Sequence, residues 1–145
     1  MSDAEEEISM ERVEHFSSAH RLHSLNLTDD ENKKTYGKCN NPNGHGHNYV
    51  WRAILSGPIH PITGMVFDLA IVKKAMAEIN DIVDHKNLDK DVEFFKNTVS
   101  TSENLAKFLY LELEKRLPEE GRRLLKKVVL EETPRNIFTY RKKNC

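Results

Sequence analysis

The segment ISMERVEHFSSAH, residues 8–20, is the first predicted strand of this chain, and the order of the elements that begins with it decides the fold class. Its residues alternate imperfectly between two faces, and the β-branched and aromatic side chains favour a strand that ends near His20 or Leu22. A second strand, HNYVWRAILSG, is predicted over residues 47–57 on the same grounds. Two shorter strands are predicted near the end of the chain, over residues 127–132 and 137–141.

Two helices are predicted between the second and third strands. The first begins after Asp68, a good N-cap residue, and the second begins in a capping box in which Ser100 is the cap and Glu103 reaches back to it. Pro118 and Gly121 close the second helix. The apolar faces consist of Leu69, Val72, Met76, Ile79 and Val83 in the first helix and Leu105, Phe108, Leu109, Leu113 and Leu117 in the second.

The order strand, strand, helix, helix, strand, strand predicts an α+β fold with an antiparallel four-stranded sheet and two helices on one face. Such a sheet keeps two open edges and one uncovered face, which predicts oligomerisation. Residues 24–44 are polar and rich in turn formers, and we interpret them as a long loop. We expect an acidic, disordered segment over residues 1–7 and a single domain over residues 8–145.

Composition narrows the function classes. The chain has 145 residues, of which 38% are hydrophobic and 31% charged, as in water-soluble globular domains. Lys and Arg number 22 against 23 Asp and Glu, a balance that argues against electrostatic binding of nucleic acid. No apolar stretch approaches the roughly 20 residues of a membrane span, and the acidic start does not resemble a signal peptide. With two cysteines, Cys39 and Cys145, we expect a reducing compartment, the cytoplasm.

The pair His45 and His47 is the most informative motif of the sequence. Two residues apart on an extended backbone, both imidazoles project from one face, where they can share a metal ion. His20 could supply a third nitrogen if the first two strands pair, and three histidines leave the fourth position of Zn²⁺ open, as in catalytic sites. The alternative is that His45 and His47 are turn residues without a metal.

Three further places in the sequence, with five residues between them, carry candidate chemistry. Cys39 follows Lys38 in the predicted loop, where a cation and a nearby metal would favour the thiolate, although a small buried thiol is the alternative. Asp84 and His85 end the first helix, where a histidine can also simply interact with the helix dipole. Of the neighbours Glu131 and Glu132, one must face inward, towards an N–H-rich partner such as an amidine, unless both are solvated at a strand end.

Taken in order, several segments resemble the 6-pyruvoyl tetrahydropterin synthase family, and the resemblance runs from about residue 8 to residue 141. The segments are FSSAHRL (16–22), GKCNNPNGHGHNY (37–49), TGMV (63–66), DHKNL (84–88), STSEN (100–104) and ET (132–133).

The resemblance implies a zinc-dependent lyase of the tunnelling fold, in which three subunits close a barrel, two trimers stack into a hexamer, and the active sites lie at subunit interfaces. It implies one Zn²⁺ per subunit and assigns its ligands, the catalytic residues and the pterin contacts by position. These are His20, His45 and His47 for zinc, Cys39 with the relay pair Asp84 and His85 and with Glu132 for catalysis, and Glu132 and Thr101 for the pterin ring.

The implied reaction converts 7,8-dihydroneopterin triphosphate to 6-pyruvoyl-tetrahydropterin with loss of triphosphate, in tetrahydrobiopterin biosynthesis. Mg²⁺ would accompany the triphosphate, and no nicotinamide or flavin is needed because the redox change is internal to the substrate. Candidate triphosphate contacts are Arg21, Lys33, Lys34 and Lys38. The alternatives are a relative that makes 6-carboxy-tetrahydropterin in the deazaguanine pathway, a Cys-His-Asp thiol hydrolase, and a non-enzymatic zinc-binding module.

Overall fold

A five-stranded sheet with the strand order β3-β1-β2-β4-β5 is the main feature of the computed structural model, which describes residues 6–143. The two long strands at its centre pair antiparallel along their whole length, from Ile8 opposite Gly57 to His20 opposite His45. The other pairs are antiparallel except β1 with β3. The strands are β1 (Ile8–His20), β2 (His45–Gly57), β3 (Lys86–Asn87), β4 (Leu125–Thr133) and β5 (Asn136–Tyr140).

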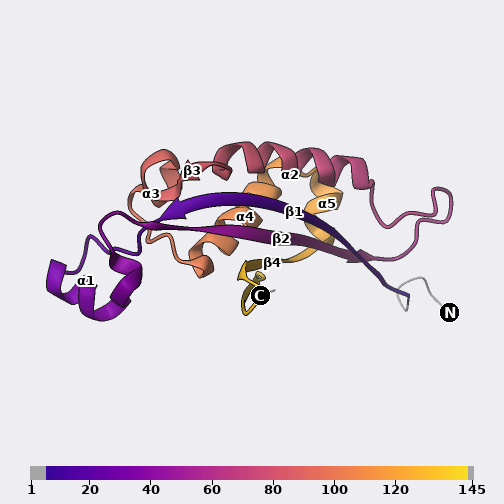
Figure 1. Cartoon of the computed structure of the whole chain (residues 1–145). Helices are drawn as coiled ribbons and strands as arrows, with labels where there is room; N and C mark the ends of the chain where they lie inside the picture. The colour runs from indigo at the N-terminus through magenta and orange to yellow at the C-terminus, as the bar shows by residue number, and fades with distance from the viewer. Residues whose placement is uncertain (1–5, 144–145) are drawn as a thin grey trace.

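The helices form a layer on one face of this sheet. Helix α2 packs on β1, α4 packs on β4 and β5, and the two long helices contact each other (Figure 1). Helix α1 lies apart from this layer, beyond the end of β1. The helices are α1 (Asp29–Tyr36), α2 (Leu69–Val83), α3 (Leu88–Asp91), α4 (Ser102–Arg116) and α5 (Glu119–Leu124), with 3-10 turns η2 (Gly37–Asn40) and η3 (Glu93–Lys96).

The core lies between the sheet and the helices. Alternate strand residues enter it, so Tyr49 and Trp51 of β2 are fully buried, while Val50 and Arg52, which follow them, face the other side. The Trp51 indole N–H donates to the side-chain oxygen of Asn80 in α2 over 3.0 Å, which satisfies the polar atom of a buried ring. The predicted apolar helix faces are buried as well, with the exception of Leu69, which is exposed.

The prediction of four antiparallel strands is wrong in one respect. All four predicted strands are present, but Lys86 and Asn87 add the fifth, β3, which lies parallel to β1 beside Ser18 and Ala19. A strand of two residues shows no alternation of polar and apolar side chains, so periodicity cannot reveal it. The sheet is therefore mixed.

The interpretation of residues 24–44 as a loop without secondary structure is also wrong. Helix α1 begins after Thr28 with a capping box, in which the Thr28 hydroxyl accepts from the Glu31 N–H over 3.1 Å and the Glu31 carboxylate accepts from the Thr28 N–H over 2.9 Å. The helix has no apolar face, and its one buried residue is Asn32. Capping rather than hydrophobic periodicity was the signal for this helix.

The start of α4 differs by one residue from the prediction. Thr101, not Ser100, is the N-cap, and its hydroxyl accepts from the Asn104 N–H over 3.2 Å. Ser100 is buried and uses its hydroxyl to donate to Asp89 instead. At the other end Pro118 precedes a further short helix, α5, which contains the buried Gly121.

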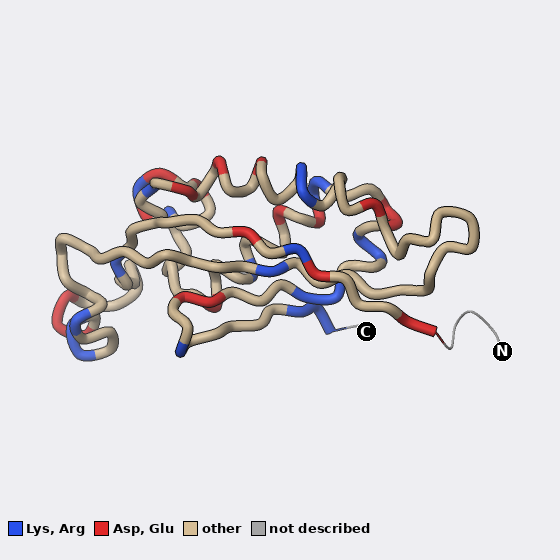
Figure 2. The backbone as a smooth tube through the Cα atoms, turned by 45° about the vertical axis from the view of Figure 1, so that its right-hand side comes forward, with Lys and Arg blue, Asp and Glu red and all other residues tan. Residues whose placement is uncertain are grey.

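Charged residues of both signs are interspersed over the sheet and the helices, as Figure 2 shows. Within residues 6–143 none of the helices has the length and apolar character that crossing a membrane requires. The expected disordered segment over residues 1–7 lies mostly outside the described part of the chain, as does Cys145.

Glu112 in α4 is a buried carboxylate held by two cations, Lys115 at 2.7 Å and Arg116 at 3.1 Å. Burial raises the pKa of Glu112, but the hydrogen bonds and charges of the two cations outweigh burial and leave that pKa below its ordinary value of 4.5. A carboxyl with a lower pKa in the folded state stabilises the fold above its unfolded-state pKa, and this stabilisation is lost as the pH falls through the folded-state pKa.

We therefore expect Glu112→Gln to lower the free energy of unfolding by about 1–2 kcal/mol above roughly pH 5, and by progressively less at more acidic pH. Urea unfolding of the variant and the parent protein across pH 3–7 measures this difference. A difference that does not change with pH would contradict the role of the two ion pairs.

Candidate active site

The pairing of β1 with β2 brings three histidines together. His20 lies directly opposite His45, and His47 lies opposite Ser18, so the three side chains share one face of the ribbon. Their ring centroids are 4.6 Å apart for His20 and His45, 5.3 Å for His20 and His47, and 5.0 Å for His45 and His47. The three residues singled out from the sequence are thus one cluster.

The chemistry of this cluster fits a metal ion. One nitrogen from each ring lies within 4.8 Å of the other two. The Nε2 atoms of His20 and His47 are buried and have no hydrogen-bond partner among residues 6–143, an arrangement that costs free energy unless another group binds them. Burial lowers the pKa of both His20 and His47, which favours the neutral imidazole, the form that binds metals.

A glycine allows the two strands to approach at this end. A Cβ atom on Gly44 would lie 2.9 Å from the carbonyl oxygen of His20, and Gly44 has a positive φ of 74°. Any other residue at this position would push the start of β2, which carries His45, away from the end of β1.

Glu132 is the carboxylate that faces the histidines. Its Oε1 lies 3.1 Å from Nε2 of His47, in an orientation that does not make a hydrogen bond. Glu132 shares its parity along β4 with the buried residues Val128 and Leu130, whereas Glu131 faces the opposite side and lies 3.8 Å from Arg52. The register of β4 therefore distinguishes two neighbours that the sequence left open.

Cys39 lies in the turn η2, between α1 and β2. Its backbone carbonyl accepts from the Leu22 N–H over 3.0 Å, which fixes the turn beside the end of β1. The thiol is free and half-buried. Cys39 is not part of the histidine cluster that could hold a metal.

Asp84 and His85 follow the end of α2 and lie at the edge of the sheet next to β1. The Asp84 carboxylate lies 2.9 Å from Nδ1 of His85 and accepts from the backbone N–H of Ser17 over 2.9 Å. The backbone N–H of His85 donates to the carbonyl of Ser17. The hydrogen bond from Ser17, supported by His85, lowers the pKa of Asp84 and favours the carboxylate.

His85 has an unusual backbone conformation, and its side chain is exposed. His85 has a positive φ of 60°, a strained conformation for a residue with a side chain, and its side chain is 85% exposed. Among the interactions within residues 6–143, none joins this pair to Cys39.

Tyr49 is a site residue that the sequence argument did not single out. Its ring lies 5.5 Å from that of His47, and its buried hydroxyl has no hydrogen-bond partner within the described chain. Burial, together with the charges of Glu132 and Asp89, raises the pKa of Tyr49, so the phenol remains a neutral donor. The signal was available, because Tyr49 continues the parity of His45 and His47.

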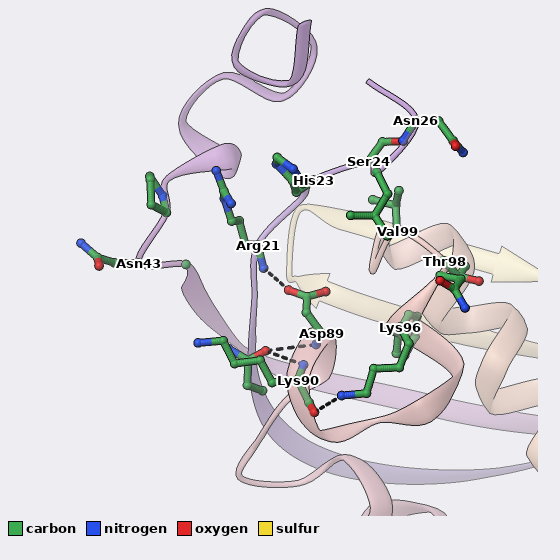
Figure 3. A pocket seen from close by; sticks show the side chains of 16 residues that line it. Arg21, His23, Ser24, Asn26, Asn43, Asp89, Lys90, Lys96, Thr98 and Val99 are labelled. Carbon is green, nitrogen blue, oxygen red and sulfur yellow. Dashed lines mark hydrogen bonds between the residues drawn. The ribbon is translucent and has the colours of Figure 1, made fainter. Parts of the chain in front are cut away.

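A cavity of about 340 Å³ adjoins the cluster. It is lined by the residue after His20 and the residue before His45, which are Arg21 and Gly44, and by groups from other elements that include His23, Asp89, Lys90 and Lys96. Figure 3 shows the Asp89 carboxylate in this cavity, where it accepts a hydrogen bond from the backbone N–H of Arg21.

Comparison with known proteins gives consistent matches. The sequence model of the family described as 6-pyruvoyl tetrahydropterin synthase matches residues 8–143. A putative 6-pyruvoyl tetrahydrobiopterin synthase from Caenorhabditis elegans is 59% identical over 92% of this chain and 94% of its own length. The human 6-pyruvoyl tetrahydrobiopterin synthase is 51% identical over 87% of this chain and 86% of its own.

A solved structure of a protein with the same family name also matches this chain. The structure of the Caenorhabditis elegans 6-pyruvoyl tetrahydropterin synthase superposes with a TM-score of 0.91 at 57% identity, and the match covers 95% of this chain and 97% of that one.

Proposed function

Because the chain belongs to the 6-pyruvoyl tetrahydropterin synthase family, we propose that it converts 7,8-dihydroneopterin triphosphate to 6-pyruvoyl-tetrahydropterin and releases triphosphate, as a step in tetrahydrobiopterin synthesis. The observation that carries the proposal is the cluster of His20, His45 and His47, with two orphaned ring nitrogens, next to the carboxylate of Glu132. The cluster supplies a metal site, and the carboxylate supplies an acceptor for the N–H groups of a pterin.

We assign the metal site to one Zn²⁺ ion per subunit, held by the three histidines. When bound, zinc would act as a Lewis acid that stabilises the enolate-like charge developing on the substrate side chain. Three protein ligands are typical of catalytic rather than structural zinc.

Glu132 and Thr101 are proposed to orient the pterin ring. The Glu132 carboxylate can accept two N–H groups from the amidine-like edge of the ring. The Thr101 hydroxyl oxygen already accepts from the Asn104 N–H, which leaves its own O–H free to donate to the ring edge.

Cys39, Asp84 and His85 are proposed to move the protons. The Cys39 thiolate would take a proton from a side-chain carbon of the substrate, and His85 would return one. Asp84 is fixed by Ser17 and bonds Nδ1 of His85, so Nε2 of this exposed ring is left to face the substrate.

A site shared between subunits would bring together Cys39 and the Asp84–His85 pair, which no hydrogen bond or ion pair joins within residues 6–143. The outer edge of β1 is paired with β3 only at Ser18 and Ala19, and β5 has a strand on one side only within the described chain. We propose that the free edges of β1 and β5 pair between subunits, so that three chains close a barrel and two trimers stack into a hexamer. Asp84 and His85, at the edge beside β1, would then reach Cys39 of a neighbouring subunit.

The remaining assignments complete the proposal. Mg²⁺ would accompany the triphosphate, for which Arg21 beside the cavity and Lys33, Lys34 and Lys38 are candidate contacts. A role for a free Cys39 thiol agrees with a cytoplasmic location, where thiols stay reduced.

The test is to incubate the zinc-loaded protein with 7,8-dihydroneopterin triphosphate and Mg²⁺ and to identify the pterin product by mass while triphosphate release is followed. We expect a pyruvoyl product and loss of turnover when the metal is removed by a chelator. A carboxy product would assign the deazaguanine-pathway reaction to the same site. Turnover that survives metal removal would favour a thiol hydrolase, and zinc binding without turnover would favour a binding module.

A further inference from the structure

The buried imidazole of His20 is held by a backbone carbonyl. Its Nδ1 lies 2.7 Å from the carbonyl oxygen of Ser100, and the side chain is almost completely buried. Because a carbonyl can only accept, Nδ1 carries the proton, and the lone pair is left on Nε2. That Nε2 is the orphaned atom that faces His45 and His47.

Ser100 is itself fixed by Asp89. The Ser100 hydroxyl donates to Oδ1 of Asp89 over 2.6 Å, and Oδ2 of the same carboxylate accepts from the backbone N–H of Arg21 over 2.7 Å. Arg21 is the residue after His20, so the contacts form a closed ring that runs from His20 through Arg21, Asp89 and Ser100 back to His20. Both the backbone of His20 and the partner of its imidazole are tied to one carboxylate.

The fold holds Asp89 in this place. Asn87, at the end of β3, caps the short helix α3 by accepting from the N–H groups of Asp89 and Lys90. Since β3 pairs with β1 beside Ser18 and Ala19, Asp89 arrives next to the end of β1. The sequence argument assigned no role to this aspartate.

We propose that Asp89 and the Ser100 hydroxyl are positioning groups of the metal site, which hold the Ser100 carbonyl against Nδ1 of His20 and so fix the orientation of His20 as a ligand. The direct partner of a ligating histidine raises its affinity for the metal, and losing that partner costs roughly tenfold to 100-fold in affinity, the loss expected when the Ser100 carbonyl is no longer held in place. The inference rests on the metal site of the proposed function but not on the reaction.

Zinc affinity of the full-length protein, measured by competition with a chromogenic chelator, tests the proposal. We expect Asp89→Ala and Ser100→Ala each to weaken zinc binding by roughly tenfold to 100-fold, and to alter the visible absorption of Co²⁺ bound in place of zinc. The double variant should lose little more than the worse single variant, because both side chains act on one imidazole. Ser100→Ala removes one hydroxyl and keeps the carbonyl, so it serves if Asp89→Ala does not fold.

Asp68→Ala is the matched control. Asp68 caps α2 by accepting from the Ala70 N–H over 2.9 Å, and it takes no part in the ring of contacts around His20. Its removal should lower Tm by about 3 °C and leave zinc affinity unchanged.

Asp89 and Ser100 variants that are less stable without metal but bind zinc as tightly as the parent protein would show a purely structural role and overturn the proposal, as would a parent protein that binds no zinc. A parent protein that binds zinc but does not turn over the pterin would reject the proposed reaction alone, and the affinities would still decide the role of Asp89.

Discussion

Replacing Cys39 by alanine is expected to lower kcat by about 10²–10⁴-fold, the range typical for removal of a positioned proton-transfer group. The side chain is half-buried in η2 and belongs to a turn that Leu22 holds beside the end of β1, so a loss of one sulfur atom leaves the surrounding backbone contact in place. The three histidines are untouched, and zinc content should therefore stay the same. Turnover and zinc content measured on the same preparation separate the two effects.

Cys145→Ala is the natural control, because it removes the other cysteine, which lies outside the described residues. It should leave kcat unchanged. Full activity of the Cys39→Ala variant would remove this thiol from the mechanism and assign the proton transfer to another group.

Glu132→Gln is expected to lower kcat/KM by about 100-fold, whereas Glu131→Gln should change it by less than about twofold. The glutamine amide keeps one acceptor oxygen but turns an NH₂ donor towards the second pterin N–H, so one charge-assisted hydrogen bond worth about 1.5–3 kcal/mol is lost and the other becomes neutral. The two variants are closely matched, since the residues are neighbours on β4 and make the same chemical change on opposite faces of the sheet.

Steady-state kinetics with the pterin triphosphate measure both variants, and thermal unfolding checks that both are folded. Equal losses would mean that the two carboxylates act through the sheet rather than through the ligand. A larger loss for Glu131→Gln would place the pterin on the opposite face.

The parts of the fold that the sequence predicted are those with a repeated apolar pattern. Strands β1, β2 and β4 and helices α2 and α4 each span 9 or more residues, and the structure contains all of them as well as the shorter predicted strand β5. Helix α1 was not predicted because its stability rests on a capping box and not on burial. Strand β3 was not predicted because two residues cannot show a period. The cap of α4 was displaced because Ser100 and Thr101 are both suitable caps, and only the position of Asp89 decides between them.

The candidate site was also predicted only in part. The spacing of His45 and His47 predicted that they share a face, since parity along one strand is visible in the sequence. Residue spacing did not distinguish Glu131 from Glu132, which requires the register of β4, and only the family resemblance assigned Glu132. No pattern in the sequence indicated Asp89, because the ring around His20 joins segments 68 residues apart. Contacts between distant segments follow from the topology and not from local patterns.

The pairing of His20 with His45 also links metal binding to the register of the central ribbon. The two residues come together only when the β1–β2 ribbon has formed its native register, and a slip of one residue would turn one ligand to the opposite face. A metal ion that binds all three histidines would therefore bind only chains in which β1 and β2 pair in the native register. By mass action, such binding would shift the equilibrium from misaligned conformations towards the native register. A metal held by the cluster would therefore stabilise the native register of β1 with β2, independently of any substrate.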